Sequence, residues 1–94
     1  PEYIISVVSE HYGVTPADLS GNKRNSKIVM PRQIAMYLCR DILDTSLKTI
    51  GKNLGDRDHT TVMHGIEKIE NELKTNDNLK NSIDTLRKKI NPQG

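Results

Sequence analysis

Residues 55–65, GDRDHTTVMHG, place an Arg, two Asp, two His and two Thr within eleven positions. The residues that follow repeat with helical spacing, and the apolar members of this repeat are Val62, Ile66, Ile69 and Leu73. The spacing predicts a long helix over about 58–75 with one buried face. A crowded polar stretch at a helix start is typical of a catalytic site, a metal site or the tip of a DNA-reading helix. The rest of the sequence distinguishes among these three kinds of site.

Further helices are predicted on both sides of this stretch. They cover about residues 4–12, 15–20, 31–44 and 46–54, and a last helix spans Leu79 to Ile90. The sequence has no strand-like alternation. We therefore expect an all-α fold of about six helices with a central helix-turn-helix, whose two helices are 46–54 and 58–75.

The signals at the predicted helix ends agree with this assignment. Thr15 followed by Pro16 has the pattern of an N-cap and a first helical residue, and Thr45 or Ser46 is placed to cap the next helix but one. Gly13 and Gly55 are placed to end helices in a left-handed conformation. Residues 21–30, GNKRNSKIVM, show no helical period and are expected to form an exposed loop.

The charge of the chain is unevenly distributed. The formal net charge is only +2, yet residues 19–40 contain five basic residues and no acid. A solvated surface is the usual explanation for such a block, but its position just before a helix-turn-helix favours contact with phosphates. The five basic residues are Lys23, Arg24, Lys27, Arg32 and Arg40.

Metal binding and catalysis find little support in the same residues. His59 and His64 are five positions apart, so they do not share a helix face as a zinc pair would. Asp58 and His59 are neighbours that point in different directions, and no nucleophile motif accompanies them. Glycine-rich nucleotide-binding motifs are also missing from the sequence. We expect no metal, no cofactor and no enzyme activity in these 94 residues.

Length indicates the number of domains, and cysteine content indicates the cellular compartment. Ninety-four residues suit one domain, 1–94, and the lack of an initial Met suggests a piece of a longer protein. Cys39 is the only cysteine, which favours a reducing compartment. No apolar run is long enough for a membrane helix. The chain is therefore expected to be cytoplasmic, and the DNA-binding role argued next would associate it with the nucleoid.

In a helix-turn-helix, the second helix places its N-terminal residues in the DNA major groove. The first turn here presents Asp58, His59 and Thr60, which can accept from or donate to base edges. Arg57, just before them, is expected to reach a phosphate. The alternative is that Asp56 or Asp58 is an ordinary helix cap with no other role.

The basic block extends the same interpretation. Arg24 and Lys27 are expected to lie in a loop that reaches a minor groove. Arg32, Gln33 and Arg40 fall outside the apolar stripe of their helix, so they are expected on its solvent side, where phosphates would run.

Three segments together resemble a known family. The segments RDHTTVMHGIEKI, PRQIAMYLCRDI and GNKRNSKIVM resemble the C-terminal DNA-binding domain of the bacterial DnaA replication initiators, and the likeness runs from about residue 5 to residue 90. The resemblance implies an all-helical domain that recognises a DnaA box in double-stranded DNA at a replication origin. It also implies an ATP-binding module upstream, outside this chain, and regulatory proteins and acidic phospholipids as partners of the full-length protein.

The resemblance assigns roles to individual residues. Arg24 is expected in the minor groove, and Asp58, His59 and Thr60 at bases in the major groove. Backbone or peripheral contacts are expected from Lys23, Lys27, Arg32, Gln33, Arg40, Leu47, Lys48, Arg57 and Thr61. Lys48 stands where the family often has Pro, so it is either an added phosphate contact or merely exposed.

A protein–protein module is the competing class of function. In that interpretation the last helix would present its apolar stripe to a regulator. Salt distinguishes the two classes, because binding through several phosphates weakens steeply with ionic strength whereas an apolar contact does not.

Overall fold

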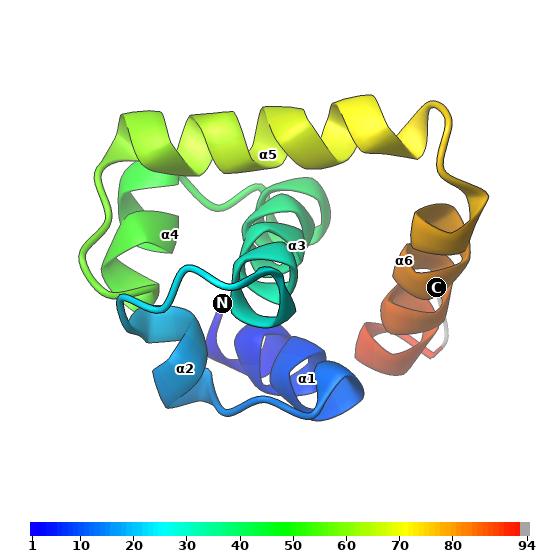
Figure 1. The fold of residues 1–94 in the computed structure, drawn as a ribbon, viewed down its shortest axis with the longest axis horizontal. Coiled ribbons are helices and arrows are strands. Elements are labelled where there is room, and N and C mark those ends of the chain that lie inside the picture. Colours follow the sequence, from blue (N-terminus) through cyan, green and yellow to red (C-terminus); the bar gives the residue numbers. More distant parts are fainter. Residues whose placement is uncertain (93–94) are drawn as a thin grey trace.

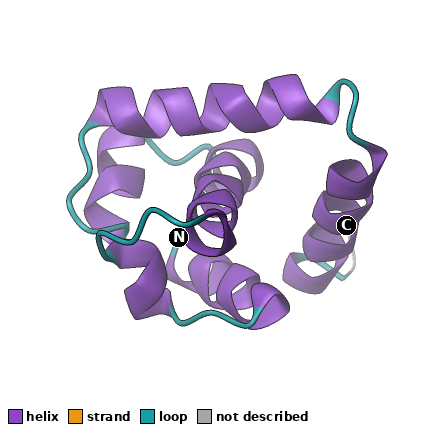
Figure 2. Ribbon diagram, in the orientation of Figure 1, coloured by secondary structure: helices purple, strands orange, loops and turns teal. Residues whose placement is uncertain are grey.

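The computed structural model describes residues 1–92, which form six helices and no strand (Figure 1, Figure 2). The helices are α1 (Glu2–Tyr12), α2 (Pro16–Ser20), α3 (Ser26–Leu43), α4 (Leu47–Asn53), α5 (His59–Leu73) and α6 (Asp77–Ile90). The expected all-α class is confirmed, and α4 and α5 are the two helices of the helix-turn-helix.

Helix α3 runs through the middle of the molecule and contacts α1, α2, α4 and α5. In Figure 1, α5 lies above α3 and α1 and α2 lie below it, while α4 stands to its left and α6 to its right. This arrangement places the first turn of α5 next to α4 and far from α6.

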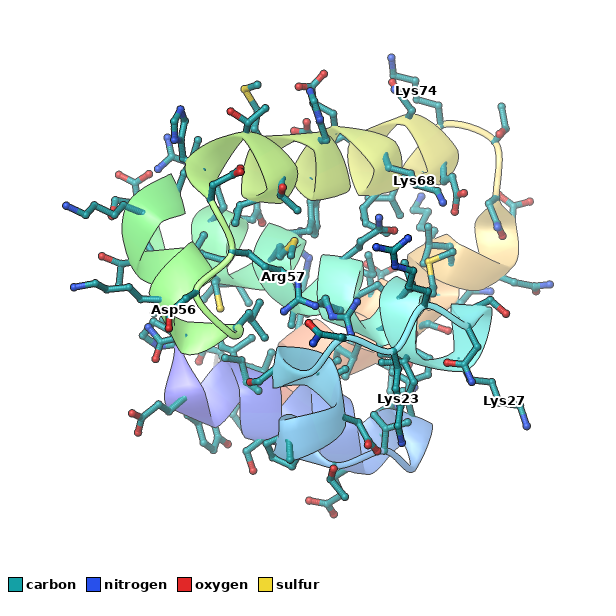
Figure 3. The ribbon with its side chains drawn as sticks, turned by 60° about the vertical axis from the view of Figure 1, so that its left-hand side comes forward. Lys23, Lys27, Asp56, Arg57, Lys68 and Lys74 are labelled. Atoms are coloured by element: carbon teal, nitrogen blue, oxygen red, sulfur yellow. The ribbon has the colours of Figure 1, made fainter. Side chains whose placement is uncertain are left out.

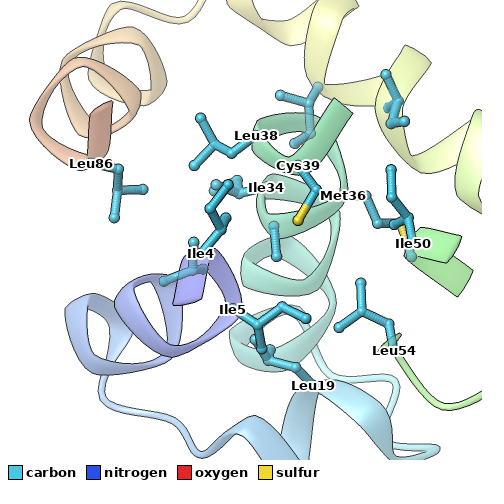
Figure 4. Packing of buried hydrophobic residues seen from close by; sticks show 14 of the residues in the cluster. Ile4, Ile5, Leu19, Ile34, Met36, Leu38, Cys39, Ile50, Leu54 and Leu86 are labelled. Carbon is cyan, nitrogen blue, oxygen red and sulfur yellow. The ribbon is translucent and has the colours of Figure 1, made fainter. Parts of the chain in front are cut away.

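The core is built from aliphatic side chains (Figure 4). Ile34 and Leu38 of α3 are fully buried at its centre, and Ile50, Val62 and Ile69 bring α4 and α5 against them. Helix α6 also contributes its apolar face, through Leu79, Ile83 and Leu86. The alternative interpretation, in which the last helix presents its apolar stripe to a partner, loses support because these three side chains are already buried in the core.

Most helix ends follow the capping signals in the sequence. The Thr15 hydroxyl accepts from the Asp18 amide at 3.0 Å, and Asp18 accepts from the Thr15 amide in return, which makes a capping box. Ser46 caps α4 by accepting from the Thr49 amide. Gly13 ends α1 with φ 67°, as its position predicts.

The start of α3 differs from the sequence prediction. Residues 21–30 were expected to be a loop, but α3 begins at Ser26, with Asn25 as its N-cap and Pro31 inside the helix. Proline costs one backbone hydrogen bond at this position. Ile28 and Pro31 are both buried, so packing of these side chains offsets that loss. The connecting loop is reduced to residues 21–25.

Two glycines allow the turn between α4 and α5 to pack tightly. A Cβ on Gly51 would lie 1.9 Å from the Arg57 carbonyl oxygen. A Cβ on Gly55, which has φ +78°, would lie 2.0 Å from the Ser20 carbonyl oxygen. The backbone of the turn therefore rests directly on the end of α2, which brings loop 21–25 close to the start of α5.

Candidate nucleic-acid interface

The first turn of α5 begins at a side-chain cap. Asp58 is the N-cap, and its Oδ1 accepts from the Thr61 amide at 2.8 Å. The same hydrogen bond is the main reason why the pKa of Asp58 is lowered from its ordinary value. The capping role that the sequence left open is thus present in the free protein, while the carboxylate stays exposed to solvent.

The neighbouring polar residues of this turn all face solvent. His59, Thr60 and Thr61 are exposed, whereas Val62 is fully buried and fixes the helix against the core. The tip of α5 therefore presents ring nitrogens, hydroxyls and a carboxylate to solvent, while the helix behind them is fixed against the core. These groups can donate to or accept from the edges of bases in a major groove.

Helix α4 adds positive charge beside this tip. Lys48 and Lys52 are exposed and four residues apart, so they lie on one side of the helix. Together with Asp56, Arg57, Asp58 and His59 they line an open hollow of about 300 Å³. Lys52 was missed by the sequence analysis, although its spacing from Lys48 is a usable signal.

Loop 21–25 carries Arg24, which is predicted for the minor groove, and Lys23, which is predicted for a backbone or peripheral contact. Arg24 is exposed, and Lys23 is tethered through its Nζ to Asp18 Oδ1 at 3.1 Å. Lys27 does not lie in the loop as expected. It is exposed in the first turn of α3, because that helix starts earlier than its sequence pattern indicates, and its side chain extends outward (Figure 3).

Arg32 is not on the solvent side of α3, where it was expected. Its side chain is buried, with 6% of its surface exposed. The guanidinium donates to the carbonyl oxygens of Leu19 (2.7 Å), Asp18, Gly21 and Lys23. Burial is the main cause of the lowered pKa of Arg32. A buried arginine is accommodated here because several main-chain oxygens satisfy its donors.

Arg57 was also expected to point toward phosphate, and it too is turned inward (Figure 3). Its Nη2 donates to the Gly21 carbonyl oxygen at 2.5 Å, and its Nη1 donates to the carbonyl oxygens of Leu54 and Ser20. The side chain is half-buried, and burial lowers its pKa. Its guanidinium is therefore occupied within the free protein.

The remaining residues predicted for the backbone have different environments. Arg40 is exposed, and it donates to the Thr45 carbonyl oxygen at 3.0 Å. Leu47 is half-buried at the start of α4. Gln33 is not on the open solvent side of α3, where it was expected, because α5 crosses α3 at this residue and leaves it half-buried. Its Oε1 is buried without a hydrogen-bond partner in the described structure.

The crossing of α3 and α5 is unusually close at Gln33. A Cβ on Gly65 would lie 3.3 Å from Gln33 Cγ and 2.7 Å from Met36 Sδ. Lys68, which follows Gly65 by three residues, is exposed on the side of α5 that faces the start of α3 (Figure 3). Lys68 is not among the basic residues that the sequence predicts for the interface.

Residues 1–92 contain neither a metal-binding cluster nor a membrane-spanning helix. Within them, His, Cys, Asp and Glu side chains form no group of three or more that could hold a metal ion. None of the helices described combines the length and apolar character that spanning a bilayer requires.

Comparisons with known proteins give one consistent result. The family model described as the bacterial DnaA protein helix-turn-helix matches residues 1–69. The chromosomal replication initiator protein DnaA of Lachnoclostridium phytofermentans is 48% identical over 91 residues, which cover 97% of this chain and 20% of that protein. The protein of the same name from Oenococcus oeni is 54% identical over 87 residues, covering 93% of this chain and 19% of that protein.

A solved structure agrees with these sequence relatives. It is described as the crystal structure of a DNA replication initiation factor, and it superimposes with a TM-score of 0.83 at 36% identity. The superposition covers 94% of this chain and 27% of that chain. The chain thus spans about a fifth of the length of the curated relatives it matches.

Proposed function

The chain belongs to the bacterial DnaA helix-turn-helix family, and from this premise we propose that it binds DnaA boxes in double-stranded DNA at replication origins. A DNA-binding role in replication initiation follows from the family. The choice of box, and the side chains that read it, are our proposal. The observation that carries it is the exposed polar first turn of α5, which the buried Val62 fixes against the core, together with the exposed Arg24 of loop 21–25.

In the proposed complex, the start of α5 lies in the major groove. Asp58, His59 and Thr60 contact base edges there, and Thr61 supports them from the same turn. Hydroxyls, imidazole and carboxylate each have base-edge partners, and a threonine methyl packs on the methyl group of thymine. An acid so close to phosphates weakens non-specific binding, so beyond its role as helix cap the charge of Asp58 favours DNA binding only if it selects a base.

Arg24 occupies the adjacent minor groove in the same complex. A narrow minor groove has an enhanced negative potential that attracts arginine. Arg24 is exposed on a five-residue loop without acids, so it can reach outward while the loop stays attached to α2 and α3. Lys23 supports it from the preceding position.

We call the start of α5 and loop 21–25 the two reading elements. Phosphates run along the outside of them. Arg40, Lys48 and Lys27 are exposed cations predicted from the sequence, and Lys52 and Lys68 join them from the structure. Gln33 and Leu47 contribute peripheral contacts. Arg32 and Arg57 are left out of this set, since their guanidinium groups are bound to carbonyl oxygens inside the protein.

We propose no catalysis and no cofactor for this domain. In the full-length relatives an ATP-binding module would lie outside the segment matched here, and regulatory proteins or acidic phospholipids would be partners of that longer protein. The chain itself would act by placing such a module at an origin.

The test compares a duplex containing a DnaA box with a scrambled duplex of the same length. Arg24→Ala should weaken binding to the box by about 1–3 kcal/mol while scrambled DNA is affected much less. The melting temperature should not change, because an exposed loop residue supports little packing. Titrations by fluorescence anisotropy and a thermal melt supply both measurements.

Lys80→Ala is the matched control, since it removes an exposed cation from α6, away from the interface. It should leave both affinities nearly unchanged. Equal affinity of the unaltered chain for both duplexes would contradict box recognition. An Arg24→Ala loss that is the same on both duplexes would contradict the minor-groove assignment.

A further inference from the structure

Two guanidinium groups meet at the carbonyl oxygen of Gly21. Arg32 Nη2 approaches it to 3.2 Å and Arg57 Nη2 to 2.5 Å. Arg32 comes from α3 and Arg57 from the turn before α5, so side chains from two separate elements donate to the same carbonyl oxygen of loop 21–25. After burial, the nearby charge of Arg57 is the second cause of the lowered pKa of Arg32. We call this pair of side chains the arginine clasp.

The end of α2 explains how two cations can be held so close together. The last carbonyl groups of a helix lack partners within the helix and form its negative end. Here Arg32 donates to the Leu19 carbonyl oxygen at 2.7 Å, and Arg57 donates to that of Ser20 at 3.5 Å. Only arginine offers several donors in one planar group, so lysine could satisfy only part of this set.

The arginine clasp ends next to both reading elements. Arg32 Nη2 also donates to the Lys23 carbonyl oxygen at 3.1 Å, and the next residue is Arg24. Arg57 immediately precedes Asp58, the N-cap of α5, and its own amide donates to the Gly51 carbonyl oxygen at 3.0 Å. The clasp therefore joins the peptide before Arg24 to the peptide before the recognition helix.

We propose that Arg32 and Arg57 are positioning residues that hold loop 21–25 at a fixed offset from the start of α5. This inference rests on the proposed function, in which Arg24 and the tip of α5 enter neighbouring grooves of one duplex. Two contacts on a rigid duplex can form together only if their separation in the protein is right. A loop that is ordered before binding also avoids the entropy cost of ordering it on the DNA.

Arg57→Lys tests the proposal because it keeps the charge and removes the planar fork. We expect it to weaken box binding about tenfold, as the loop must then be ordered on the DNA. In an Arg24→Ala background the same change should have almost no further effect, because the offset matters only when Arg24 is present. Arg32→Lys should behave in the same way.

Arg87→Lys is the matched control, since Arg87 is also half-buried and hydrogen-bonded, to Tyr37, but lies on α6. It should leave box affinity unchanged in both backgrounds. A loss from Arg57→Lys that persists in full without Arg24 would overturn the proposal. So would equal weakening on box and scrambled DNA, which indicates a direct phosphate contact that does not depend on the sequence.

A measurement without DNA separates this proposal from the proposed function. Backbone ¹⁵N order parameters of Lys23 and Arg24 should fall in Arg57→Lys while those of α5 stay unchanged. Unchanged loop order parameters would overturn the arginine clasp even if the domain prefers the box. Conversely, a domain with no box preference and a loosened loop would refute the proposed function but retain the clasp. Should Arg32→Lys fail to fold, the half-buried Arg57 still provides the test.

Discussion

Asp58 has a structural role that leaves room for base recognition. Its Oδ1 is bound to the Thr61 amide at 2.8 Å in the free protein, so the cap does not depend on DNA. An ionised carboxylate has two oxygens and about four lone-pair sites, so one hydrogen bond does not exhaust it. Capping and base recognition can therefore coexist in this side chain.

Asp58→Asn and Asp58→Ala separate these roles. Asparagine keeps a capping oxygen but removes the charge, whereas alanine removes both, so only alanine should lower the melting temperature clearly. Both should weaken box binding and leave scrambled binding unchanged or slightly tighter, because an acid has been removed beside phosphates. If the ratio of box to scrambled affinity stays constant in both variants, Asp58 is a cap and nothing else.

The same variants predict a change in acid stability. A carboxylate whose folded pKa is lowered stabilises the protein fully above its unfolded pKa, near 3.8, and loses that contribution as the pH falls through the folded pKa. The unaltered chain should therefore lose stability below about pH 4, and Asp58→Ala should lose less over the same range. Asp18, whose pKa is also lowered, keeps part of the acid dependence in every variant. Denaturant midpoints measured from pH 2 to 6 give the comparison.

Arg32 and Arg57 show where residue-level prediction from the sequence stops. The spacing of apolar residues correctly excludes Arg32 from the apolar stripe of α3. A residue outside that stripe is expected to be exposed to solvent. Its partners are main-chain oxygens up to 14 residues earlier, and those of Arg57 lie up to 37 residues away. No local pattern encodes such carbonyl groups, so the inward position of both side chains could not be predicted from the sequence.

At the scale of elements, the sequence predicts what is periodic or capped. The helix after Asp58 and the caps at Thr15 and Ser46 agree with the structure, because each depends on residues within one turn. The start of α3 does not, because it depends on burial of Ile28 and Pro31 against other helices. The tertiary contacts of these two side chains override the weak helical signal of 26–30.

The turn of the helix-turn-helix depends on Gly51. A Cβ there would lie 1.9 Å from the Arg57 carbonyl oxygen, a backbone atom that cannot move without displacing the start of α5. We expect Gly51→Ala to lower the free energy of unfolding by about 1–3 kcal/mol. Chemical denaturation measures this loss.

Lys52→Ala provides the matched control for that turn, since Lys52 is the next residue of α4 and is exposed. It should leave the free energy of unfolding within about 0.5 kcal/mol of the unaltered chain. Gly51→Ala should also weaken box binding, because Arg57 and Asp58 move with the displaced turn. A Gly51→Ala variant that is fully stable would mean that the turn relaxes without cost, contrary to the close packing described.

Over the whole molecule, the reading elements and the last helix lie apart. In Figure 1, α4, the start of α5 and loop 21–25 lie toward one end, and α6 stands at the other. The match to the family model stops at residue 69, before α6 begins at Asp77. Helix α6 nonetheless contributes Leu79, Ile83 and Leu86 to the core, so its main contribution is to stability.

Leu86→Ala tests this division. Leu86 is fully buried, so its truncation should lower the free energy of unfolding by about 2–5 kcal/mol. Box affinity, measured at a temperature where the variant is folded, should stay the same because no proposed DNA contact involves α6. If Leu86→Ala does not fold, Ile83→Val makes a smaller cavity, at about 0.5–1.5 kcal/mol, and serves the same comparison. Reduced box affinity in a folded variant would show that α6 also fixes the reading elements, whose geometry would then depend on the whole core.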